Sequence, residues 1–494
     1  MYFAHTLTKL KRDNIANFIT FEIIDDNIKL FDGKEFNTIS IEDFFLNYII
    51  KKYHNYYFYC NNSIDKLLIF AQKLNVNFNA ISYYKDTIGI ICKKDKIKIT
   101  ISNSTFLLKD NKIAECDKLY YILNEFYKDL NVGCKSTISS LSLSNFRKNF
   151  MKNDIEGLNS TVEEFIRESY AGGRTEIFKT KSDPNRIVYH YDFNSMYPSA
   201  MLEDMPNGQA IYTKTFIKDK IGFYKCEVEV PSFTKIPTLY VRKHNHLIFP
   251  VGKFTGVYDL VELIEAVRYG AKIKLLYGFY FTEKEKMFKE YVEHYYNIKK
   301  NATDSISRDR AKNMINFLYG KFGQKREVEN IIYSEDAKTC VSKGYSPVDI
   351  NGQEDKGFWK THSMARSAHI IPSISAHITA LSRVKLHKLM VKNQLDLLYC
   401  AVDSIDTYNK LETGVEIGEL KLEYCYKNVV YHLPMYYEGD LCDENGKLTG
   451  EKKETNVDKE INKKYDKRTI NGIETKPINL NLSYKIKEKL WNLK

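Results

Sequence analysis

The sequence contains no pair of cysteines in a Cys-x-x-Cys arrangement. Its nine cysteines are scattered along 494 residues. An odd, unpatterned set fits neither a disulfide framework nor a zinc ribbon. We therefore expect free thiols and a reducing compartment.

Long apolar runs are also missing. The stretch LLIFAQKLNVNF is soon interrupted by polar residues, so no segment is predicted to span a bilayer and no membrane partner is expected. The N-terminal MYFAHTLTKLKRDNIANF lacks the apolar core of a secretory signal. It is also too poor in Arg and Ser for a transit peptide. The pattern gives no support for organelle import, although synthesis inside an organelle is not excluded.

The composition is that of a globular protein with a basic balance. Hydrophobic residues make up 43% and charged residues 28%, and 74 basic minus 63 acidic residues leave a net charge of +11. A basic surface favours a polyanionic partner. A solvated basic surface is the alternative, because many lysines also follow from an A/T-rich coding sequence.

The chain alternates strand-like and helix-like segments, which predicts α/β and α+β domains. Before residue 150, NFITFEII, YYFYC and IGIIC are typical of strands, whereas SIDKLLIFAQKL and CDKLYYILNEFYKDL are typical of helices. The Ser-rich CKSTISSLSLSN is expected to be a linker or a domain boundary, and residues 327–359 a hairpin-rich insertion. The charged stretch from Gly439 is expected to be a mobile loop followed by a short helix in LSYKIKEKLWNL.

The segment DFNSMYPSAM follows an apparent strand, RIVYHY, so Asp192 is expected at a strand end. A carboxylate there is well placed to hold a metal ion. Taken alone, however, one Asp is more often part of an ordinary strand-to-helix turn.

Three other segments favour the metal-binding interpretation. In YAGGRTEIF, paired glycines let the backbone approach a ligand closely. In RAKNMINFLYGKFG, Lys312, Asn316 and Tyr319 recur at i, i+4 and i+7 and therefore share one helix face. The segment LLYCAVDSIDTY is expected to be two strands about a turn with Asp403 at the bend. Two carboxylates at neighbouring strand ends, with a basic helix, suit two-metal phosphoryl transfer with Mg²⁺ or Mn²⁺.

These segments, in this order, resemble family B DNA polymerases, and most closely their protein-primed branch in bacteriophages, adenoviruses and mitochondrial linear plasmids. The resemblance covers most of residues 165–437. It implies a ribonuclease H-like exonuclease domain (1–150), a palm and fingers (151–437), and a reduced thumb or charged extension (438–494). It also implies a primer–template DNA and deoxynucleoside triphosphates as partners, a terminal protein as a further partner, and a mitochondrion or phage-infected cytoplasm as location.

The resemblance also implies roles for single residues. Asp192 and Asp403 match the catalytic metal ligands. The backbone at Ser195 matches a phosphate cradle, and Tyr197 matches the ring that excludes a ribose 2′-hydroxyl. The remaining matches concern the nucleotide and the nucleic acid. They place Lys312 at the triphosphate, Asn316 and Tyr319 at the nascent base pair, Tyr170, Gly172 and Gly173 at the template, and Tyr437 at the primer end.

The palm motifs depart from the family pattern at two positions. The family's Tyr-x-Asp-Thr-Asp-Ser appears as Tyr-Cys-Ala-Val-Asp-Ser, so Ala401 replaces the first Asp. The family's Lys-x-Tyr appears as Met-Tyr-Tyr, so Met435 replaces the Lys that contacts the primer. A methionine has no strong donor for a phosphate.

The exonuclease motifs are also incomplete. The family's Asp-x-Glu falls on Glu22 and Ile24 in one register and on Thr20 and Glu22 in the other, so one carboxylate is lost in either. Matches to the second and third motifs are Asn61, Asp65 and Asp117, with Ile113 at the usual Tyr. A two-metal nuclease needs its full carboxylate set, so we expect no proofreading.

Three functions remain open from the sequence. The first is a DNA polymerase, weakened by the substitutions. The second is a pseudoenzyme derived from a polymerase and retained as a nucleic-acid-binding or structural subunit of an organellar ribonucleoprotein, with RNA as its partner. The third, a generic α/β nuclease, has the least support because the best-preserved motifs lie outside the nuclease segment.

Overall fold

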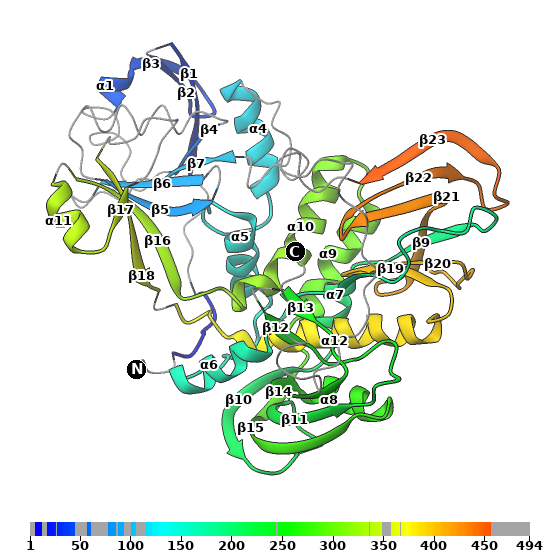
Figure 1. Ribbon diagram of the computed structural model, residues 1–494. Helices are drawn as coiled ribbons and strands as arrows, with labels where there is room; N and C mark the ends of the chain where they lie inside the picture. Colours follow the sequence, from blue (N-terminus) through cyan, green and yellow to red (C-terminus); the bar gives the residue numbers. More distant parts are fainter. Residues whose placement is uncertain are drawn as a thin grey trace. The chain divides into compact units, whose positions relative to one another are not determined.

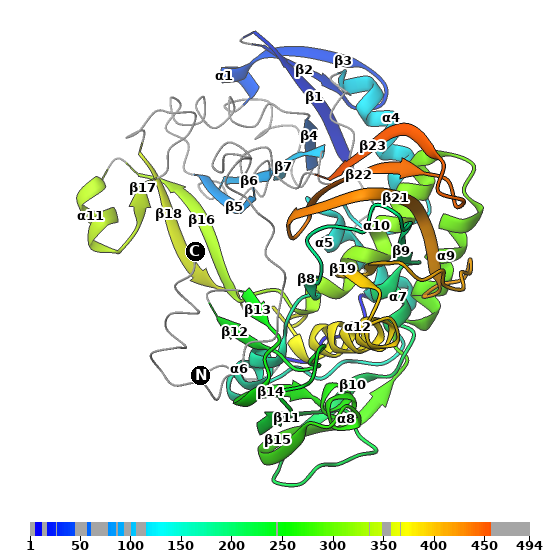
Figure 2. The same ribbon diagram turned by 45° about the vertical axis from the view of Figure 1, so that its right-hand side comes forward.

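The computed structural model describes most of the chain in two compact units (Figures 1 and 2). Unit 1 comprises Met1–Thr6, Ile155–Val292 and Ile371–Lys494, and unit 2 comprises Leu7–Asp154 and Glu293–Ile370. The described residues are 5–11, 17–25, 27–44, 57–60, 78–84, 87–92, 100–104, 115–243, 246–334, 336–347, 357–365 and 367–455. Each unit therefore combines segments that are far apart in the sequence, and the three predicted domain bounds stay a prediction.

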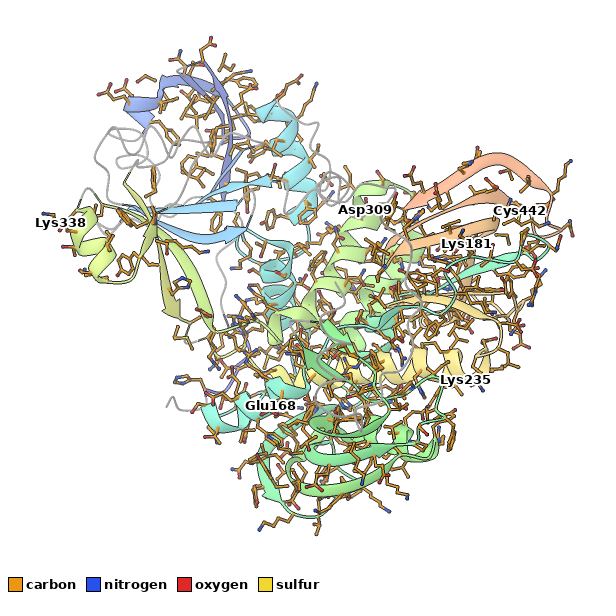
Figure 3. The ribbon with its side chains drawn as sticks, in the orientation of Figure 1. Glu168, Lys181, Lys235, Asp309, Lys338 and Cys442 are labelled. Carbon is orange, nitrogen blue, oxygen red and sulfur yellow. The ribbon has the colours of Figure 1, made fainter. Side chains whose placement is uncertain are left out.

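A seven-stranded antiparallel sheet forms the centre of unit 1, in the order β23-β22-β21-β9-β20-β19-β8. Its strands are β8 (Thr175–Ile177), β9 (Val188–Phe193), β19 (Leu397–Ala401), β20 (Ser404–Thr407), β21 (Leu420–Leu433), β22 (Tyr436–Cys442) and β23 (Leu448–Thr455). The aromatic and β-branched residues of β9 suit a central, buried position, and the apolar residues of β19 are all buried. In Figure 3, Cys442 is labelled at the end of β22.

Both faces of this sheet are covered by apolar side chains. On one face, α12 (Pro372–Lys392) contributes Leu386 and Met390 to a core with Tyr191 and Ile405. The other face carries an aromatic cluster formed by Tyr399, Tyr426, Tyr431 and Tyr437 together with smaller apolar residues. Because β9 is packed on both sides, its register is strongly specified.

Unit 1 contains a second antiparallel sheet in the order β10-β15-β11-β14. Its strands are β10 (Met205–Thr213), β11 (Gly222–Val230), β14 (Gly252–Asp259) and β15 (Lys272–Glu285). Around it lie α6 (Ser160–Ser169), α7 (Met196–Ala200), α8 (Leu260–Arg268) and the hairpin β12 (Val241–Lys243) and β13 (His246–Ile248). Helix α9 (Lys289–Asn301) leads the chain into unit 2.

Unit 2 contains a five-stranded sheet in the order β3-β2-β1-β4-β7, covered by α4 (Cys116–Tyr127). The strands are β1 (Phe18–Ile24), β2 (Asn27–Phe31), β3 (Phe36–Ser40), β4 (Tyr57–Cys60) and β7 (Thr100–Asn103), and the short helix α1 (Ile41–Asp43) follows β3. The first three strands are antiparallel, and β4 and β7 continue the sheet in parallel. This is the strand order expected of a ribonuclease H-like domain.

A second five-stranded sheet of unit 2 has the order β17-β18-β16-β5-β6. Its members are β5 (Phe78–Tyr84), β6 (Thr87–Cys92), β16 (Glu327–Tyr333), β17 (Ser346–Pro347) and β18 (Phe358–Met364), with α11 (Ala337–Ser342) between β16 and β17. The helices α5 (Ile138–Asn145), η3 (Phe146–Phe150) and α10 (Ser305–Phe322) complete the unit. The predicted hairpin insertion is confirmed, whereas its pairing with β5 was not predicted.

Most of the predicted strands and helices are confirmed where the structure describes them, among them β1, β4, β6, β9, α4 and α10. The linker predicted in the Ser-rich stretch is wrong, because Ile138–Asn145 form α5 with Leu141 and Ser142 fully buried. Thr137 accepts a hydrogen bond from the Ser140 amide, and the Ser142 hydroxyl donates to the Ile138 carbonyl. The serine hydroxyls therefore find partners within the helix itself.

The mobile loop predicted from Gly439 is also wrong as far as residue 455. Gly439 lies within β22, and Leu448–Thr455 form the edge strand β23. The many charged, exposed side chains of β23 are typical of an edge strand, which they protect from pairing with other chains. The helices predicted in SIDKLLIFAQKL and LSYKIKEKLWNL lie outside the described residues.

Candidate active site

Two carboxylates lie side by side at one end of the seven-stranded sheet. Asp192 is in β9, and Asp403 is in the turn that joins β19 to the neighbouring β20. Ser404 is the register partner of Asp192, and the Phe193 amide donates a 2.9 Å hydrogen bond to the Asp403 carbonyl. The structure therefore brings together the two residues predicted as metal ligands, and both are partly buried.

The two carboxylates repel each other. Burial, and then the charge of Asp403, raise the pKa of Asp192 to about 7, although the charge of His190 opposes the shift. A divalent cation between the two carboxylates would offset this repulsion. Carboxylate oxygens are the donors that Mg²⁺ and Mn²⁺ prefer, and such ions often keep several water ligands. Asp192 and Asp403 therefore fit a metal ion, while the described residues contain no group of three or more His, Cys, Asp or Glu arranged as a metal site.

The turn that carries Asp403 is tight and strained. Val402 has a φ of +58°, a conformation that is unfavourable for a β-branched residue. Its amide donates a 2.8 Å hydrogen bond to the Arg174 carbonyl, and the Asp403 amide donates to the Ala401 carbonyl at 2.6 Å. The segment before β8 thus holds the turn in place.

The two glycines predicted to touch the template have different surroundings. A Cβ on Gly173 would lie 2.8 Å from a side-chain carbon of Val402, whereas a Cβ on Gly172 would meet nothing within 4 Å. Only Gly173 is thus required by the close approach of the turn. This contact connects the Tyr170–Gly173 segment directly to the turn that carries Asp403.

Arg383, a buried side chain of α12, holds the Tyr170–Gly173 segment through hydrogen bonds to its backbone. Its Nη1 donates to the Ala171 carbonyl at 2.5 Å and to the Gly172 carbonyl at 3.0 Å, and its Nε donates to Glu262 at 2.8 Å. The Tyr170 carbonyl accepts a further hydrogen bond from Arg242. Arg383 was not predicted as a site residue, because an isolated Arg on a helix gives no signal of its long-range partners.

Ser195 and Tyr197 lie at the start of α7, directly after β9. Ser195 has a φ of +56°, and the Ser199 amide donates to its carbonyl at 2.9 Å. The neighbouring Asn194 amide donates to the Glu419 carbonyl at 2.8 Å, which ties the bend to the start of β21. Tyr197 is half-buried. Burial lowers the pKa of Arg383, but the charge of Glu262 and, more weakly, the charge interaction with Tyr197 raise it, so that the net shift is upward.

Lys312, Asn316 and Tyr319 all belong to α10, in unit 2. Lys312 is exposed, and the other two are half-buried. The opposite side of α10 is buried, with Met314, Ile315 and Leu318 among its buried residues, and the helix packs against α5. The helix and its shared face are confirmed. Their approach to Asp192 and Asp403 stays a prediction.

The hairpin between β21 and β22 contains the positions matched to the primer-binding motif. Met435 is 41% exposed at its tip, with a φ of +67°. Its amide donates a 2.9 Å hydrogen bond to the Tyr399 hydroxyl, a residue of the Asp403 motif. Tyr437 is buried, and its hydroxyl is 2.8 Å from that of Tyr424. The ring of Tyr437 thus belongs to the aromatic cluster, and its contact with a primer stays a prediction.

A buried polar network behind Asp192 was missed at the level of the sequence. Asp406 is fully buried, and its carboxylate bonds His190 Nδ1 at 2.5 Å and the hydroxyls of Tyr431 and Tyr426. Burial opposes protonation of His190, but the charge and the hydrogen bond of Asp406, together with the charges of Asp192 and Glu423, outweigh burial and raise the His190 pKa. The sequence contained one signal of this network: His190 and Asp406 each lie in a largely apolar strand. Buried polar residues need hydrogen-bond partners, so the two could have been expected to pair.

Comparisons with known proteins show the family of this chain. Residues 113–411 match the model for DNA polymerase type B, organellar and viral, which is more than half of the chain. A probable DNA polymerase of Agaricus bitorquis is 30% identical over 447 residues, covering 79% of this chain and 53% of the relative. The chain belongs to the type B DNA polymerase family.

Further type B relatives come from fungi and bacteriophages. A probable DNA polymerase of Ascobolus immersus is 32% identical over 67% of this chain and 30% of the relative, and the DNA polymerase of Streptococcus phage Cp-1 is 26% identical over 41% of this chain and 40% of the relative. The chain spans about half or less of the length of these curated relatives. Phi29 DNA polymerase, solved with primer–template DNA and incoming nucleotides, shares the fold with a TM-score of 0.67 and 17% identity over 92% of this chain and 94% of that one.

The residues matched to the family's first exonuclease motif lie in β1, where their side chains have different surroundings. Thr20 is fully buried and its hydroxyl donates to the Cys116 carbonyl at 2.7 Å, whereas Ile24 is 49% exposed. Glu22 is the one carboxylate of this motif, and it forms a 3.0 Å ion pair with Lys29. Asn61, Asp65 and Ile113 lie outside the described residues.

In the part of the chain that the structure describes, every helix is too short or too polar to cross a membrane.

Proposed function

We propose that the chain is a DNA-directed DNA polymerase of the protein-primed kind, which transfers deoxynucleotides to a primer end on a DNA template. The observation that carries this proposal is the pairing of Asp192 with Asp403 at one end of adjacent strands, with the pKa of Asp192 raised by burial and by Asp403. The family of the chain supports it.

The residues of unit 1 have distinct tasks in this reaction. Type B polymerases use divalent metal ions, and such ions at Asp192 and Asp403 would neutralise phosphate charge and favour loss of the proton from the primer 3′-hydroxyl. The backbone at Ser195 holds the triphosphate. Tyr197 occupies the volume that a ribose 2′-hydroxyl would need.

Other residues bind the nucleic acid and the nucleotide. Lys312 neutralises the triphosphate, while Asn316 and Tyr319 flank the nascent base pair. Tyr170, Gly172 and Gly173 follow the template, and Tyr437 supports the hairpin near the primer end. These roles suit the basic helix α10 and the rigid segment held by Arg383.

Ala401 and Met435 predict a weakened enzyme. A site without a carboxylate at position 401 has less negative potential for a second ion, and Mn²⁺ binds such a site more tightly than Mg²⁺. The incomplete exonuclease motif predicts that the polymerase does not proofread. A terminal protein as primer, and a mitochondrion or phage-infected cytoplasm as location, belong to the same proposal.

Primer extension on a defined template, with Mg²⁺ and with Mn²⁺, tests this function. We expect slow extension with Mg²⁺, faster extension with Mn²⁺, and none in Asp192→Asn. Asp440→Asn is the matched control, because Asp440 is a carboxylate of the same sheet in β22, two strands from β9. The double change Ala401→Asp with Met435→Lys should raise the rate, and each restored group should contribute about ten- to a hundredfold, or about 1–3 kcal/mol of transition-state stabilisation.

Absence of extension with either metal, in the parent and in the double variant, would reject the polymerase proposal if both proteins are folded. Copurification of such an inactive chain with a large ribonucleoprotein would instead support the structural-subunit hypothesis.

A further inference from the structure

A lysine lies beside the remaining carboxylate of the exonuclease-like site. Lys29 in β2 is the register partner of Glu22 in β1, and its ammonium is 3.0 Å from Glu22 Oε1. The side chains are 33% and 18% exposed, so the pair is partly shielded from water. In an antiparallel pair, directly opposite residues project from the same face of the sheet. The ammonium thus sits on the face from which Glu22 would bind a metal ion.

Further groups surround the same ammonium. Cys116 donates from its thiol to Glu22 Oε1 at 3.6 Å, and Asp117 follows it in the first turn of α4. The hydrogen bond to Glu22 is the main cause of the raised pKa of Lys29, and the charge of Asp117 adds to it. The Phe36 ring faces the ammonium at 4.7 Å, which is a cation–π distance. Lys29 is therefore in contact with Glu22 in β1 and Phe36 in β3, and the charge of Asp117 in α4 also acts on it.

This arrangement does not fit a metal-dependent nuclease site. A divalent ion at Glu22 would have to displace the ammonium from its carboxylate. It would also be repelled by the positive charge of the ammonium, which stays nearby because it faces the Phe36 ring. The substitution of a carboxylate within Thr20–Ile24 and the presence of Lys29 act in the same direction, since both reduce the negative potential available to an ion.

We propose that Lys29 is a built-in cation that replaces a divalent metal at this site and holds Glu22 next to the start of α4 without any ion. The site then contributes to the stability of unit 2 instead of to phosphodiester hydrolysis. This inference is independent of polymerase activity, because it concerns the other unit of the chain.

Manganese binding, followed by electron paramagnetic resonance, tests this proposal in the full chain. The background carries Asp192→Asn and Asp403→Asn, so that the candidate active site does not contribute. In this background we expect no Mn²⁺ binding that depends on Glu22. Adding Lys29→Met should create one Mn²⁺ site, at least tenfold tighter than any in the background, and adding Glu22→Gln should abolish it.

Two controls separate the local charge from general effects. Lys29→Arg keeps the cation and should leave Mn²⁺ unbound. Lys118→Met removes the exposed ion-pair partner of Glu115 at the same end of α4, and this variant should not bind Mn²⁺ either. If Lys29→Met does not fold, Lys29→Gln removes the charge with a polar side chain and serves as the second variant.

A thermal melt gives a readout that does not depend on binding geometry. Lys29→Met should melt below its background in EDTA and recover with Mn²⁺, while the background should not respond to Mn²⁺. Glu22-dependent Mn²⁺ binding in the background, or no gain of binding in both Lys29→Met and Lys29→Gln, would overturn the proposal. Neither result bears on primer extension.

Discussion

The proposed metal ligand Asp192 has a cost to stability. Its pKa is raised to about 7, first by burial and then by Asp403, from an ordinary value of 3.8. The native state therefore binds this proton more tightly than the unfolded chain does. The contribution to stability is complete below about pH 4 and is lost as the pH rises through about 7. Above pH 7 the Asp192 carboxylate is ionised and repels that of Asp403, and a bound cation would offset this repulsion.

We predict that Asp192→Asn stabilises the protein at pH 8 in the absence of divalent ions while it abolishes extension. The gain should be about 1–3 kcal/mol, less than the full shift at 1.36 kcal/mol per unit because solvent and relaxation reduce it. Urea unfolding at pH 8 and pH 4.5 measures this, and the gain should shrink at the lower pH. Asp440→Asn should change stability little at either pH, and equal stability of Asp192→Asn and the parent at pH 8 would contradict the assignment.

Tyr197 gives a second prediction for a single residue. If its ring lies beneath the sugar of the incoming nucleotide, Tyr197→Val opens room for a 2′-hydroxyl. Incorporation of ribonucleotides relative to deoxyribonucleotides should rise about tenfold or more, since one excluded group corresponds to about 1–3 kcal/mol of discrimination. Single-nucleotide insertion kinetics measure the ratio. Tyr212→Val is the control, because Tyr212 is a 52% exposed residue of β10. Unchanged discrimination would show that Tyr197 is a packing residue.

The turn between β19 and β20 shows how one element positions another. The turn holds Asp403 and has Val402 at a positive φ, and its amide is bonded to the Arg174 carbonyl. Gly173 leaves room for Val402, and Arg383 fixes the carbonyls on the other side of this segment. A short chain of contacts therefore runs from α12 through the Tyr170–Gly173 segment to Asp403.

We predict that Gly173→Ala lowers the extension rate about ten- to a hundredfold, because its Cβ would lie 2.8 Å from Val402 and displace the turn. Gly172→Ala isolates the effect of the clash, since both glycines are assigned to the template but a Cβ on Gly172 meets nothing within 4 Å. Extension kinetics and thermal melts of both variants measure the effect. Equal activity of the two variants would show that the turn tolerates displacement or that Asp403 does not bind the metal.

At the scale of the whole molecule, the net charge of +11 concerns the encounter with a polyanion. A protein that neutralises phosphates releases their counterions, so its affinity falls with salt. This argument depends on the number of contacted phosphates and on no particular base.

We predict that binding to a primer–template duplex weakens steeply with salt, with log K falling by about 0.9 per phosphate contact for each tenfold increase in salt. Fluorescence anisotropy at several salt concentrations between about 50 and 200 mM measures the slope. A duplex with a neutral methylphosphonate backbone is the control and should bind weakly with little salt dependence. A binding constant for natural DNA that does not change with salt would exclude a surface that follows the phosphates.

Much of the local structure could be predicted from the residues. Alternating apolar side chains and aromatic or β-branched composition predicted β1, β9, β19 and β20, and the 3.6-residue period predicted α4 and α10. The positions of Asp192 at a strand end and Asp403 in a turn followed from the same patterns. These features depend on short-range preferences, which are written in consecutive residues.

The tertiary structure decided everything that depends on distant partners. The Ser-rich stretch is a helix because its apolar residues are buried, in contact with α10, and β16 pairs with β5 across more than 240 positions of the sequence. The sequence by itself determined many of the strands and helices that carry the candidate catalytic residues. Only the fold decided that Asp403 raises the pKa of Asp192, that Arg383 holds the Gly172 carbonyl, and that Lys29 covers Glu22, because charges and hydrogen bonds act through space and not along the chain.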